Sequence, residues 1–256
     1  MNDESSPTVD VAGKRAVVVG GTTGIGRGIA RAFAADGADV IATSRSEESV
    51  AEITDELRLA DVRTTEVTCD VTDRASIERL RDVAVDTLGG VDVLVNSAGA
   101  TDHASLLDMT DAQWAFSVDV LLSGVFRACQ VFGRAMESGS IVNVSSMSAG
   151  QIREHRPAYC AAKSGVNGLT RAAAVDLAPE IRVNAIAPGF VRTELSGERL
   201  DESSPVRESI DQRTPLGHIA GTEEIAGAAV YLASDAASFT TGEVVTVDGG
   251  YDRSAL

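Results

Sequence analysis

The sequence predicts a single α/β domain, in which a doubly wound parallel sheet of about seven strands carries helices on both faces. Short runs of β-branched apolar residues alternate along the chain with stretches of helical periodicity. Short apolar strands that alternate with helices are typical of a parallel sheet covered on both faces. The 256 residues contain no internal repeat and no Pro/Gly-rich linker, which favours one domain over several.

The elements follow from this alternation. The expected strands are Ala16–Val19, Val40–Thr43, Arg63–Thr68, Val91–Val95, Ser140–Val144, Ile181–Ala187 and Val244–Val247. The expected helices are Ile25–Ala35, Glu48–Leu59, Ala75–Leu88, Asp111–Ala135, Tyr159–Ala178 and Glu223–Ala233.

Two segments stand outside the alternation. Residues 1–12 are polar and acidic, which predicts a flexible tail ahead of a folded domain at 13–256. The segment 193–216 is charged and interrupted by proline, and a loop of this length inside a compact domain is usually functional. We interpret it as a short helical lid, with a plain surface insertion as the alternative.

Charge and length exclude several classes of function. The net charge of −16 disfavours binding to nucleic acid or to anionic membranes. The longest apolar runs fall far short of the ~20 residues that cross a bilayer, and the acidic start is unlike an export signal. The sequence therefore predicts a soluble, cytoplasmic protein.

The residue types give two further expectations. The three cysteines and three histidines show no ligand or disulfide spacing, so we expect no metal site. Only two residues are lysines, Lys14 and Lys163, and carboxylates are in excess. Arginine in place of lysine with excess carboxylate resembles proteins of salt-loving (halophilic) cytoplasms, where dense salt screens self-repulsion. The alternative is an arginine-biased genome.

A glycine-rich turn links the first strand to the first helix. It reads Gly20-Gly21-Thr22-Thr23-Gly24-Ile25-Gly26. Glycine tolerates the backbone angles of such a turn and lets a phosphate approach the helix N-terminus. A turn of this kind in the first strand–helix–strand unit predicts a Rossmann-like dinucleotide site.

The end of the second strand bears on the choice of cofactor. An acid there would hydrogen-bond the ribose of NAD, but this sequence offers Ser44 and Arg45. The guanidinium suits a 2′-phosphate, so NADP is favoured over NAD. The alternative is that Arg45 pairs with Glu47 or Glu48 and that both cofactors serve.

A tyrosine and a lysine four residues apart predict acid–base chemistry. Tyr159 and Lys163 share one face of a helix, where the lysine charge favours the phenolate form of the tyrosine. Ser146 follows the strand Ser140–Val144 at its carboxyl end, where such sheets place their ligands. Its hydroxyl would hold a substrate oxygen beside the phenol, and Ser145 is the alternative if the register differs by one.

Together these motifs resemble the short-chain dehydrogenase/reductase family over about residues 13–251. Val19 replaces the threonine of that family's Thr-Gly-x3-Gly-x-Gly motif. The resemblance implies that Ser146, Tyr159 and Lys163 carry the chemistry. With the residues above, it implies that a nicotinamide cofactor contacts Gly20, Thr22, Thr23, Gly24, Ile25, Gly26, Ser44, Arg45, Asp70, Val71, Asn96, Ala98, Gly99, Tyr159, Lys163, Pro188, Gly189, Val191 and Thr193.

One position departs from the family pattern. The family has an asparagine that anchors the water of a proton relay to the lysine, and Leu121 takes that place here. Asp119 points to a different side of the helix and does not substitute for it. Either the relay runs through backbone and water alone, or proton exchange is slow.

The loop before Tyr159 points to the substrate. Arg153, His155 and Arg156 lie near the expected pocket of an otherwise acidic protein, which favours an anionic substrate. The alternative is that they pair with nearby acids. The sequence is also similar to gluconate and 2-deoxygluconate dehydrogenases, which favours a sugar acid or keto-deoxy sugar acid.

Other functions remain open at this point. Similarity to 3-oxoacyl-acyl-carrier-protein reductases makes a 3-oxoacyl thioester the alternative substrate. A non-catalytic dinucleotide sensor is the alternative from another class, which the intact Ser146, Tyr159 and Lys163 oppose. The resemblance and the long helices 111–135 and 159–178 also imply a homo-oligomer, a tetramer or a dimer.

Overall fold

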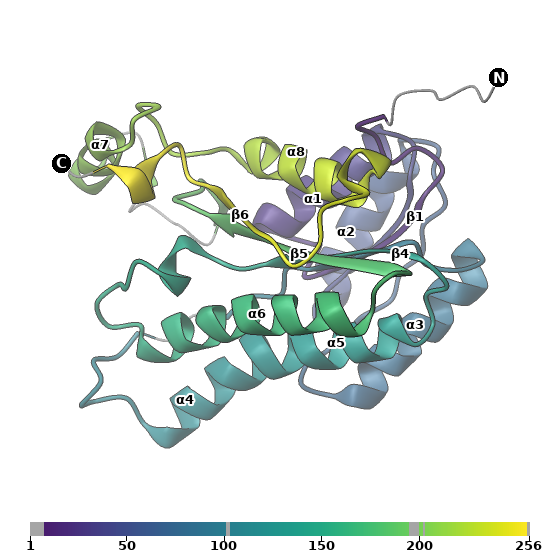
Figure 1. Ribbon diagram of the computed structural model, residues 1–256, viewed down its shortest axis with the longest axis horizontal. Helices are drawn as coiled ribbons and strands as arrows, with labels where there is room; N and C mark the ends of the chain where they lie inside the picture. The colour runs from purple at the N-terminus through teal and green to yellow at the C-terminus, as the bar shows by residue number, and fades with distance from the viewer. Residues whose placement is uncertain (1–7, 101–102, 195–199, 202, 255–256) are drawn as a thin grey trace.

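The computed structural model describes residues 8–100, 103–194, 200–201 and 203–254. Its centre is a six-stranded, wholly parallel sheet with the strand order β2-β1-β3-β4-β5-β6 (Figure 1). The strands are β1 (Arg15–Val19), β2 (Asp39–Thr43), β3 (Val93–Asn96), β4 (Gly139–Val144), β5 (Ile181–Pro188) and β6 (Val244–Val247).

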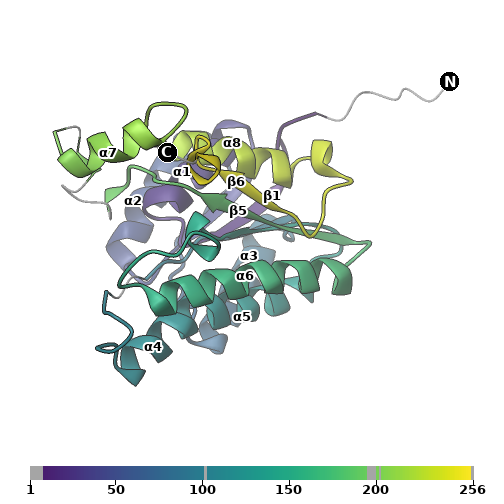
Figure 2. The same ribbon diagram turned by 60° about the vertical axis from the view of Figure 1, so that its left-hand side comes forward.

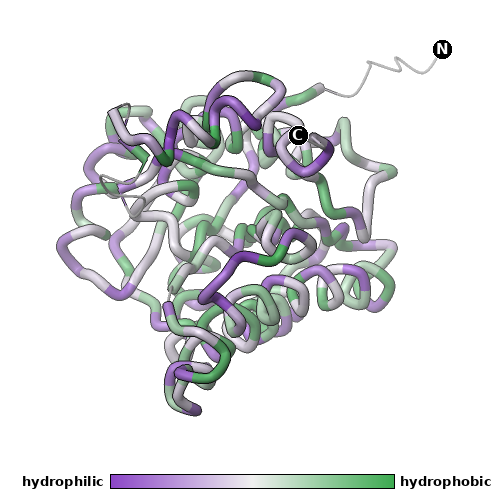
Figure 3. The backbone as a smooth tube through the Cα atoms, turned by 90° about the vertical axis from the view of Figure 1, so that its left-hand side faces the viewer, coloured by the Kyte–Doolittle hydropathy of each residue, from purple (hydrophilic) through white to green (hydrophobic). Residues whose placement is uncertain are grey.

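Helices cover both faces of this sheet, which confirms the predicted fold class. One face carries α1 (Gly24–Ala35), α2 (Glu47–Arg58) and α8 (Thr222–Ala233), with a core that includes Phe33, Ile53 and Leu232. The other carries α3 (Arg74–Leu88), α4 (Asp111–Val118), α5 (Gly124–Gly133) and α6 (Pro157–Asp176), as Figure 2 shows. Hydrophilic residues recur along the outer loops and helix turns (Figure 3).

The expected strand Arg63–Thr68 is not part of the sheet, so six strands form instead of seven. The Val40 N–H donates to the Arg63 carbonyl, and the Cys69 N–H donates to the Ser44 carbonyl. No ladder joins the described residues between these two points. The segment is rich in β-branched residues, as a strand would be, but backbone hydrogen bonds join it to β2 only near its ends.

The expected helix 111–135 is divided. Between α4 and α5 the chain makes a π-helical turn at Asp119–Ser123. The Asp119 carboxylate accepts a 2.7 Å hydrogen bond from Arg127, and Leu121 within the turn is fully buried. By length and composition alone Asp111–Gly133 is apolar enough to cross a membrane, but half of its 18-residue apolar window is buried inside the protein.

The start of the folded domain also differs from expectation. Residues 1–7 of the predicted tail lie outside the described residues. Val11, placed in the tail by sequence, is fully buried, and its carbonyl accepts from the Lys14 N–H. The fold therefore includes Val11 and does not begin at residue 13, because this valine fills the core beneath α1.

Within the predicted lid segment 193–216, positions 195–199 and 202 lie outside the described residues. The rest contains one helix, α7 (Pro205–Arg213), with proline at its first turn. Ile210 of α7 packs with Met147, Leu200, Ile219 and Tyr251 in a small hydrophobic cluster separate from the two main cores. This cluster joins α7 to the body of the domain.

Candidate active site

The loops at the carboxyl ends of the strands enclose a cavity of about 470 Å³, here called the inner cleft. This is where an open parallel sheet places its ligands. Most of the predicted site residues line it. They are Gly20, Thr22, Thr23, Gly24, Ile25, Ser44, Arg45, Asp70, Val71, Ala98, Gly99, Ser146, Arg153, Arg156, Tyr159, Lys163, Pro188, Gly189, Val191 and Thr193. Gly26, Asn96 and His155 do not.

The glycine turn is built for close approach. A Cβ on Gly20 would lie 2.5 Å from the Ala98 nitrogen, and Gly20 has a φ of +76°. A Cβ on Gly26 would lie 2.0 Å from the Gly20 carbonyl oxygen. Gly26 is therefore absent from the cleft wall because it sits beneath the turn, where it lets α1 pack directly against Gly20.

The N-terminus of α1 fits a phosphate group. Among the described residues no side chain caps this helix, although Thr23 occupies the N-cap position. The N–H groups of a first helical turn have no partner within the helix, and they favour an anion. Together with the side-chain-free wall at Gly20 and Gly24, this end of the inner cleft fits the pyrophosphate of a dinucleotide.

Ser44, Arg45 and Asp70 line the end of the inner cleft beyond β2. No ion pair joins Arg45 to Glu47 or Glu48 in the part of the chain that the structure describes. Burial raises the pKa of the Asp70 carboxyl, but hydrogen bonds from Thr72 and the charge of Arg45 outweigh it, so the pKa is lowered. The nearby Asp70 is thus an anion, and Arg45 is positioned beside it.

Asn96 belongs to a buried polar network below the inner cleft. Its Nδ2 donates to Asn143 Oδ1 at 2.9 Å, and Asn143 Nδ2 donates to Thr170 Oγ1 at 3.0 Å. The network links β3, β4 and α6 next to Cys129, whose thiol pKa burial raises to about 12. Ser97, which the sequence reasoning did not single out, lines the inner cleft instead.

The lysine on α6 is buried. Lys163 Nζ donates a 2.6 Å hydrogen bond to the Val144 carbonyl and lies 5.9 Å from the centre of the Tyr159 ring. Burial lowers the pKa of Lys163 to about 8. One turn of helix separates the two residues, as the four-residue spacing predicted. The ammonium therefore lies beside the Tyr159 ring.

The two candidate serines face different partners. Ser145 Oγ donates to Asn167 Oδ1 at 2.6 Å, which ties this buried hydroxyl to α6. Ser146 Oγ accepts from the Ser148 N–H at 3.1 Å and is partly exposed in the inner cleft. The hydroxyl proton of Ser145 is committed to Asn167, and the geometry favours Ser146 as the serine that meets a substrate.

Leu121 also lines the inner cleft, together with its neighbour Val120 from the π-helical turn. Its side chain is fully buried and apolar. The carboxylate of Asp119 is paired with Arg127. The lysine end of the cleft is therefore bounded by hydrocarbon at the position where the family pattern has an amide.

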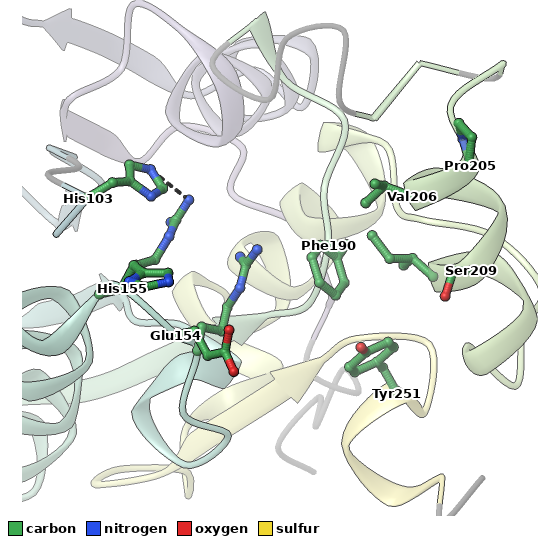
Figure 4. Close-up of a pocket in the computed structure, with 11 residues that line it drawn as sticks. His103, Glu154, His155, Phe190, Pro205, Val206, Ser209 and Tyr251 are labelled. Atoms are coloured by element: carbon green, nitrogen blue, oxygen red, sulfur yellow. Dashed lines mark hydrogen bonds between the residues drawn. The ribbon is translucent and has the colours of Figure 1, made fainter. Parts of the chain in front are cut away.

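A second cavity of about 610 Å³, here called the outer cavity, is shown in Figure 4. It adjoins the inner cleft, because the two share lining residues. His155 lines the outer cavity but not the inner cleft, and its backbone has a φ of +58°. Arg156 donates to His103 Nε2 at 3.0 Å, and the Arg153 guanidinium lies 4.9 Å above the centre of the Phe190 ring. Sequence reasoning missed His103, Phe190 and Tyr251, because they come from segments far apart in the chain and carry no local motif.

Comparisons with known proteins identify the family of the chain. Residues 19–252 match the family model described as enoyl-(acyl carrier protein) reductase. The chain is 38% identical over 242 residues to the 3-oxoacyl-[acyl-carrier-protein] reductase of Thermotoga maritima, covering 93% of this chain and 97% of that protein. It is 42% identical over 242 residues to the cis-4-hydroxycyclohexanecarboxylate dehydrogenase of Sinomonas cyclohexanicum, covering 92% and 95%.

The solved structures give the same family. A putative short-chain alcohol dehydrogenase from Sinorhizobium meliloti superposes with a TM-score of 0.92 at 36% identity, covering 97% of this chain and all of that one. The resemblance seen in the sequence is thereby confirmed, and with it a nicotinamide cofactor and a small-molecule substrate. The chain belongs to the short-chain dehydrogenase/reductase family and is an oxidoreductase that acts on CH–OH or keto groups.

Proposed function

We propose that this enzyme interconverts a secondary alcohol and a ketone on a small anionic substrate, with NADP in preference to NAD. The observation that carries the proposal is the meeting of Ser146, Tyr159 and Lys163 in the cleft that the glycine turn also lines. Acid–base residues and a phosphate-binding turn in one cavity are what hydride transfer to a carbonyl requires.

Each of the three residues has a distinct task. The nicotinamide, when bound, supplies or accepts the hydride. Tyr159 gives a proton to the substrate oxygen during reduction and takes it back during oxidation. Lys163 places its ammonium beside the Tyr159 ring, and its bond to the Val144 carbonyl fixes where that charge lies. Ser146 holds the substrate oxygen beside the phenol.

The preference for NADP is supported by Ser44 and Arg45. Both line the cleft beyond β2, and among the described residues no hydrogen bond or ion pair joins Arg45 to Glu47 or Glu48. A guanidinium at this place suits a 2′-phosphate through paired donors. Asp70 contributes a negative charge nearby, but its oxygen Oδ1 accepts from Thr72.

The anionic substrate is supported by Arg153 and Arg156, which line the cleft next to Tyr159 in a protein of net charge −16. A 3-oxoacyl thioester is the second candidate. It is favoured by the name of the Thermotoga maritima relative, a 3-oxoacyl-[acyl-carrier-protein] reductase.

The helix α7 is proposed as part of a lid. Val206, Ser209 and Ile210 from this helix line the outer cavity. We also propose a homo-oligomer, since Trp114, Phe116 and Phe126 on α4 and α5 are 42–44% exposed and would be covered by a second copy. Light scattering that finds only monomer would refute this. A cytoplasmic location stays a prediction of the sequence.

Cofactor turnover by the purified protein tests the proposal. Reduced-nicotinamide absorbance is followed with NADP and NAD against keto acids, keto-deoxy sugar acids and 3-oxoacyl thioesters, in high potassium chloride. We expect turnover with NADP that falls by about 10²-fold or more in Tyr159→Phe. Tyr231→Phe, which alters an exposed phenol on α8, is the matched control. Tight cofactor binding with no turnover of any compound would favour the sensor instead.

A further inference from the structure

The outer cavity and the inner cleft share part of their walls. His103, Arg153, Arg156 and Phe190 line both. The outer cavity therefore opens into the cleft beside Tyr159. A substrate whose reacting carbon lies at Tyr159 extends into the outer cavity, because the rest of the cleft is the part that fits the dinucleotide.

One side of the outer cavity is hydrocarbon. Figure 4 shows Phe190 and Tyr251 next to the α7 segment that carries Pro205 and Val206, and Ile210 belongs to the same lining. The Phe190 and Tyr251 rings meet edge to face with centroids 5.2 Å apart. The Tyr251 hydroxyl accepts a 3.0 Å hydrogen bond from Arg213, whose guanidinium also lies over the ring, so Tyr251 presents mainly carbon to the cavity.

This wall is unsuited to a polyhydroxylated chain. Each hydroxyl that leaves water without a partner costs about 1–3 kcal/mol. Ser209 is the hydroxyl side chain that the α7 side of the lining offers. A hydrocarbon body gains instead about 25 cal/mol for each Å² that it buries. The α7 side therefore favours a hydrocarbon skeleton over the sugar acid expected from the sequence.

The opposite side is basic where it meets the inner cleft. Arg153 and Arg156 line both cavities, whereas Glu154 and His155 line only the outer one. The two arginines thus line the cleft that holds Tyr159, whereas Glu154 does not; Arg156 Cζ is 5.7 Å from the centre of the Tyr159 ring. Phe190 stacks on the face of Arg153, and a carboxylate binds a guanidinium at its edge.

We propose that the outer cavity selects a hydroxy or keto carboxylic acid whose carbon skeleton is otherwise hydrocarbon. Arg153 and Arg156 take the carboxylate, a few carbons from the reacting carbon, and the side formed by Phe190, Val206 and Tyr251 takes the hydrocarbon. This inference rests on the proposed function and narrows its substrate. The name of the Sinomonas relative, a cis-4-hydroxycyclohexanecarboxylate dehydrogenase, describes a compound of this class.

A matched set of ketones tests the inference. The set is 4-oxocyclohexanecarboxylate, its uncharged methyl ester, a keto-deoxy sugar acid of equal charge, and an acetoacetyl thioester. With NADPH we expect kcat/KM for the carboxylate to exceed that for each of the others by about tenfold or more. Equal or higher values for the ester, the sugar acid or the thioester would overturn the inference.

Variants assign the selection to the two sides of the cavity. Arg153→Gln is expected to lower the ratio of kcat/KM for the carboxylate to kcat/KM for the ester by about tenfold, mainly through KM. Arg153→Lys is expected to restore part of this ratio. Arg79→Gln, an exposed arginine of α3, is the matched control and leaves the ratio as in the wild type. Val206→Asn is expected to lower the ratio of kcat/KM for the carboxylate to kcat/KM for the sugar acid. An unchanged ratio in Arg153→Gln contradicts the assignment.

A binding measurement separates this inference from the proposed function. Calorimetric titration of 4-oxocyclohexanecarboxylate into Tyr159→Phe with NADP present reports binding without turnover. Binding that weakens about tenfold with Arg153→Gln added supports the cavity assignment even if the wild type turns over none of the ketones. Turnover that depends on Tyr159 but prefers another compound of the set overturns the inference and leaves the proposed function standing.

Discussion

Lys163 Nζ donates a 2.6 Å hydrogen bond to the carbonyl oxygen of Val144, two residues before Ser146. The bond ties α6, which carries Tyr159 and Lys163, to the end of β4, which leads into Ser146. A shift of α6 along the sheet would break it and separate the phenol from the serine. The bond also keeps a buried charge at the centre of the site.

That buried charge makes stability depend on pH. Burial lowers the pKa of Lys163 from 10.5 to about 8, so between these pH values the unfolded chain binds more protons than the folded one. Without cofactor, stability is therefore reduced below pH 8 and rises as pH increases toward 10.5. The gain is roughly 3 kcal/mol, at 1.36 kcal/mol for each pKa unit.

Urea unfolding at several pH values between 7 and 10.5 measures this effect. Other groups titrate in the same range, so the relevant quantity is the difference in unfolding free energy between the wild type and Lys163→Met. We expect the unfolding free energy of the wild type to increase relative to that of the variant as pH rises. Parallel curves would show that Lys163 has an ordinary pKa.

Arg45 is expected to decide between the two cofactors. Arg45→Gln removes a charge-assisted contact to the 2′-phosphate, a contact that contributes about 1.5–3 kcal/mol. The KM for NADP should then rise by about tenfold or more, with a much smaller change for NAD. Arg58→Gln, which alters an exposed arginine at the end of α2, is the control. Equal losses with NADP and NAD would refute the assignment.

Leu121 is expected to limit proton exchange. Its buried side chain offers water no polar anchor near Lys163, and Leu121→Asn would supply one. We expect kcat to rise several-fold in Leu121→Asn and not in Leu121→Ala, which removes bulk without adding an amide. An unchanged rate in the asparagine variant would show that this side chain has no part in turnover. Both variants should lose stability, by roughly 2–5 kcal/mol for the alanine.

The charge of the chain predicts a dependence on salt. With a net charge of −16, the folded protein repels itself, and concentrated potassium chloride screens that repulsion. We expect the Tm to be markedly higher in molar potassium chloride than in buffer of low ionic strength. Equal Tm values in the two would reject the halophilic interpretation and leave an ordinary acidic surface.

The parts of the site that sequence predicted well are local. Gly20 and Gly26 are needed within one turn, and Tyr159 and Lys163 are separated by one turn of helix, so spacing alone defines their geometry. Spacing did not predict the role of Asn96, because its side chain bonds to Asn143 in the buried network while its neighbour Ser97 lines the cleft. Spacing indicates which segment reaches a site more reliably than which atom does.

The parts that sequence did not predict depend on contacts between distant segments. Phe190 and Tyr251 lie 61 positions apart, and only folding brings their rings together. The π-helical turn at Asp119–Ser123 leaves no periodic signal in a helix that is apolar on both sides of it. The stretch Arg63–Thr68 is rich in β-branched residues, which is typical of a strand, but no ladder of backbone hydrogen bonds joins it to β2.

The hydrogen-bonded series Asn96, Asn143 and Thr170 has a consequence for how the chain can change. Asn96 and Asn143 are direct partners in the β3–β4 register, so a slip of one residue would turn their amides to opposite faces. Replacing one member alone leaves a buried amide without its partner. The three positions are therefore expected to tolerate joint replacement by apolar residues far better than replacement of one position alone. Substitutions at the three are thus expected to occur together.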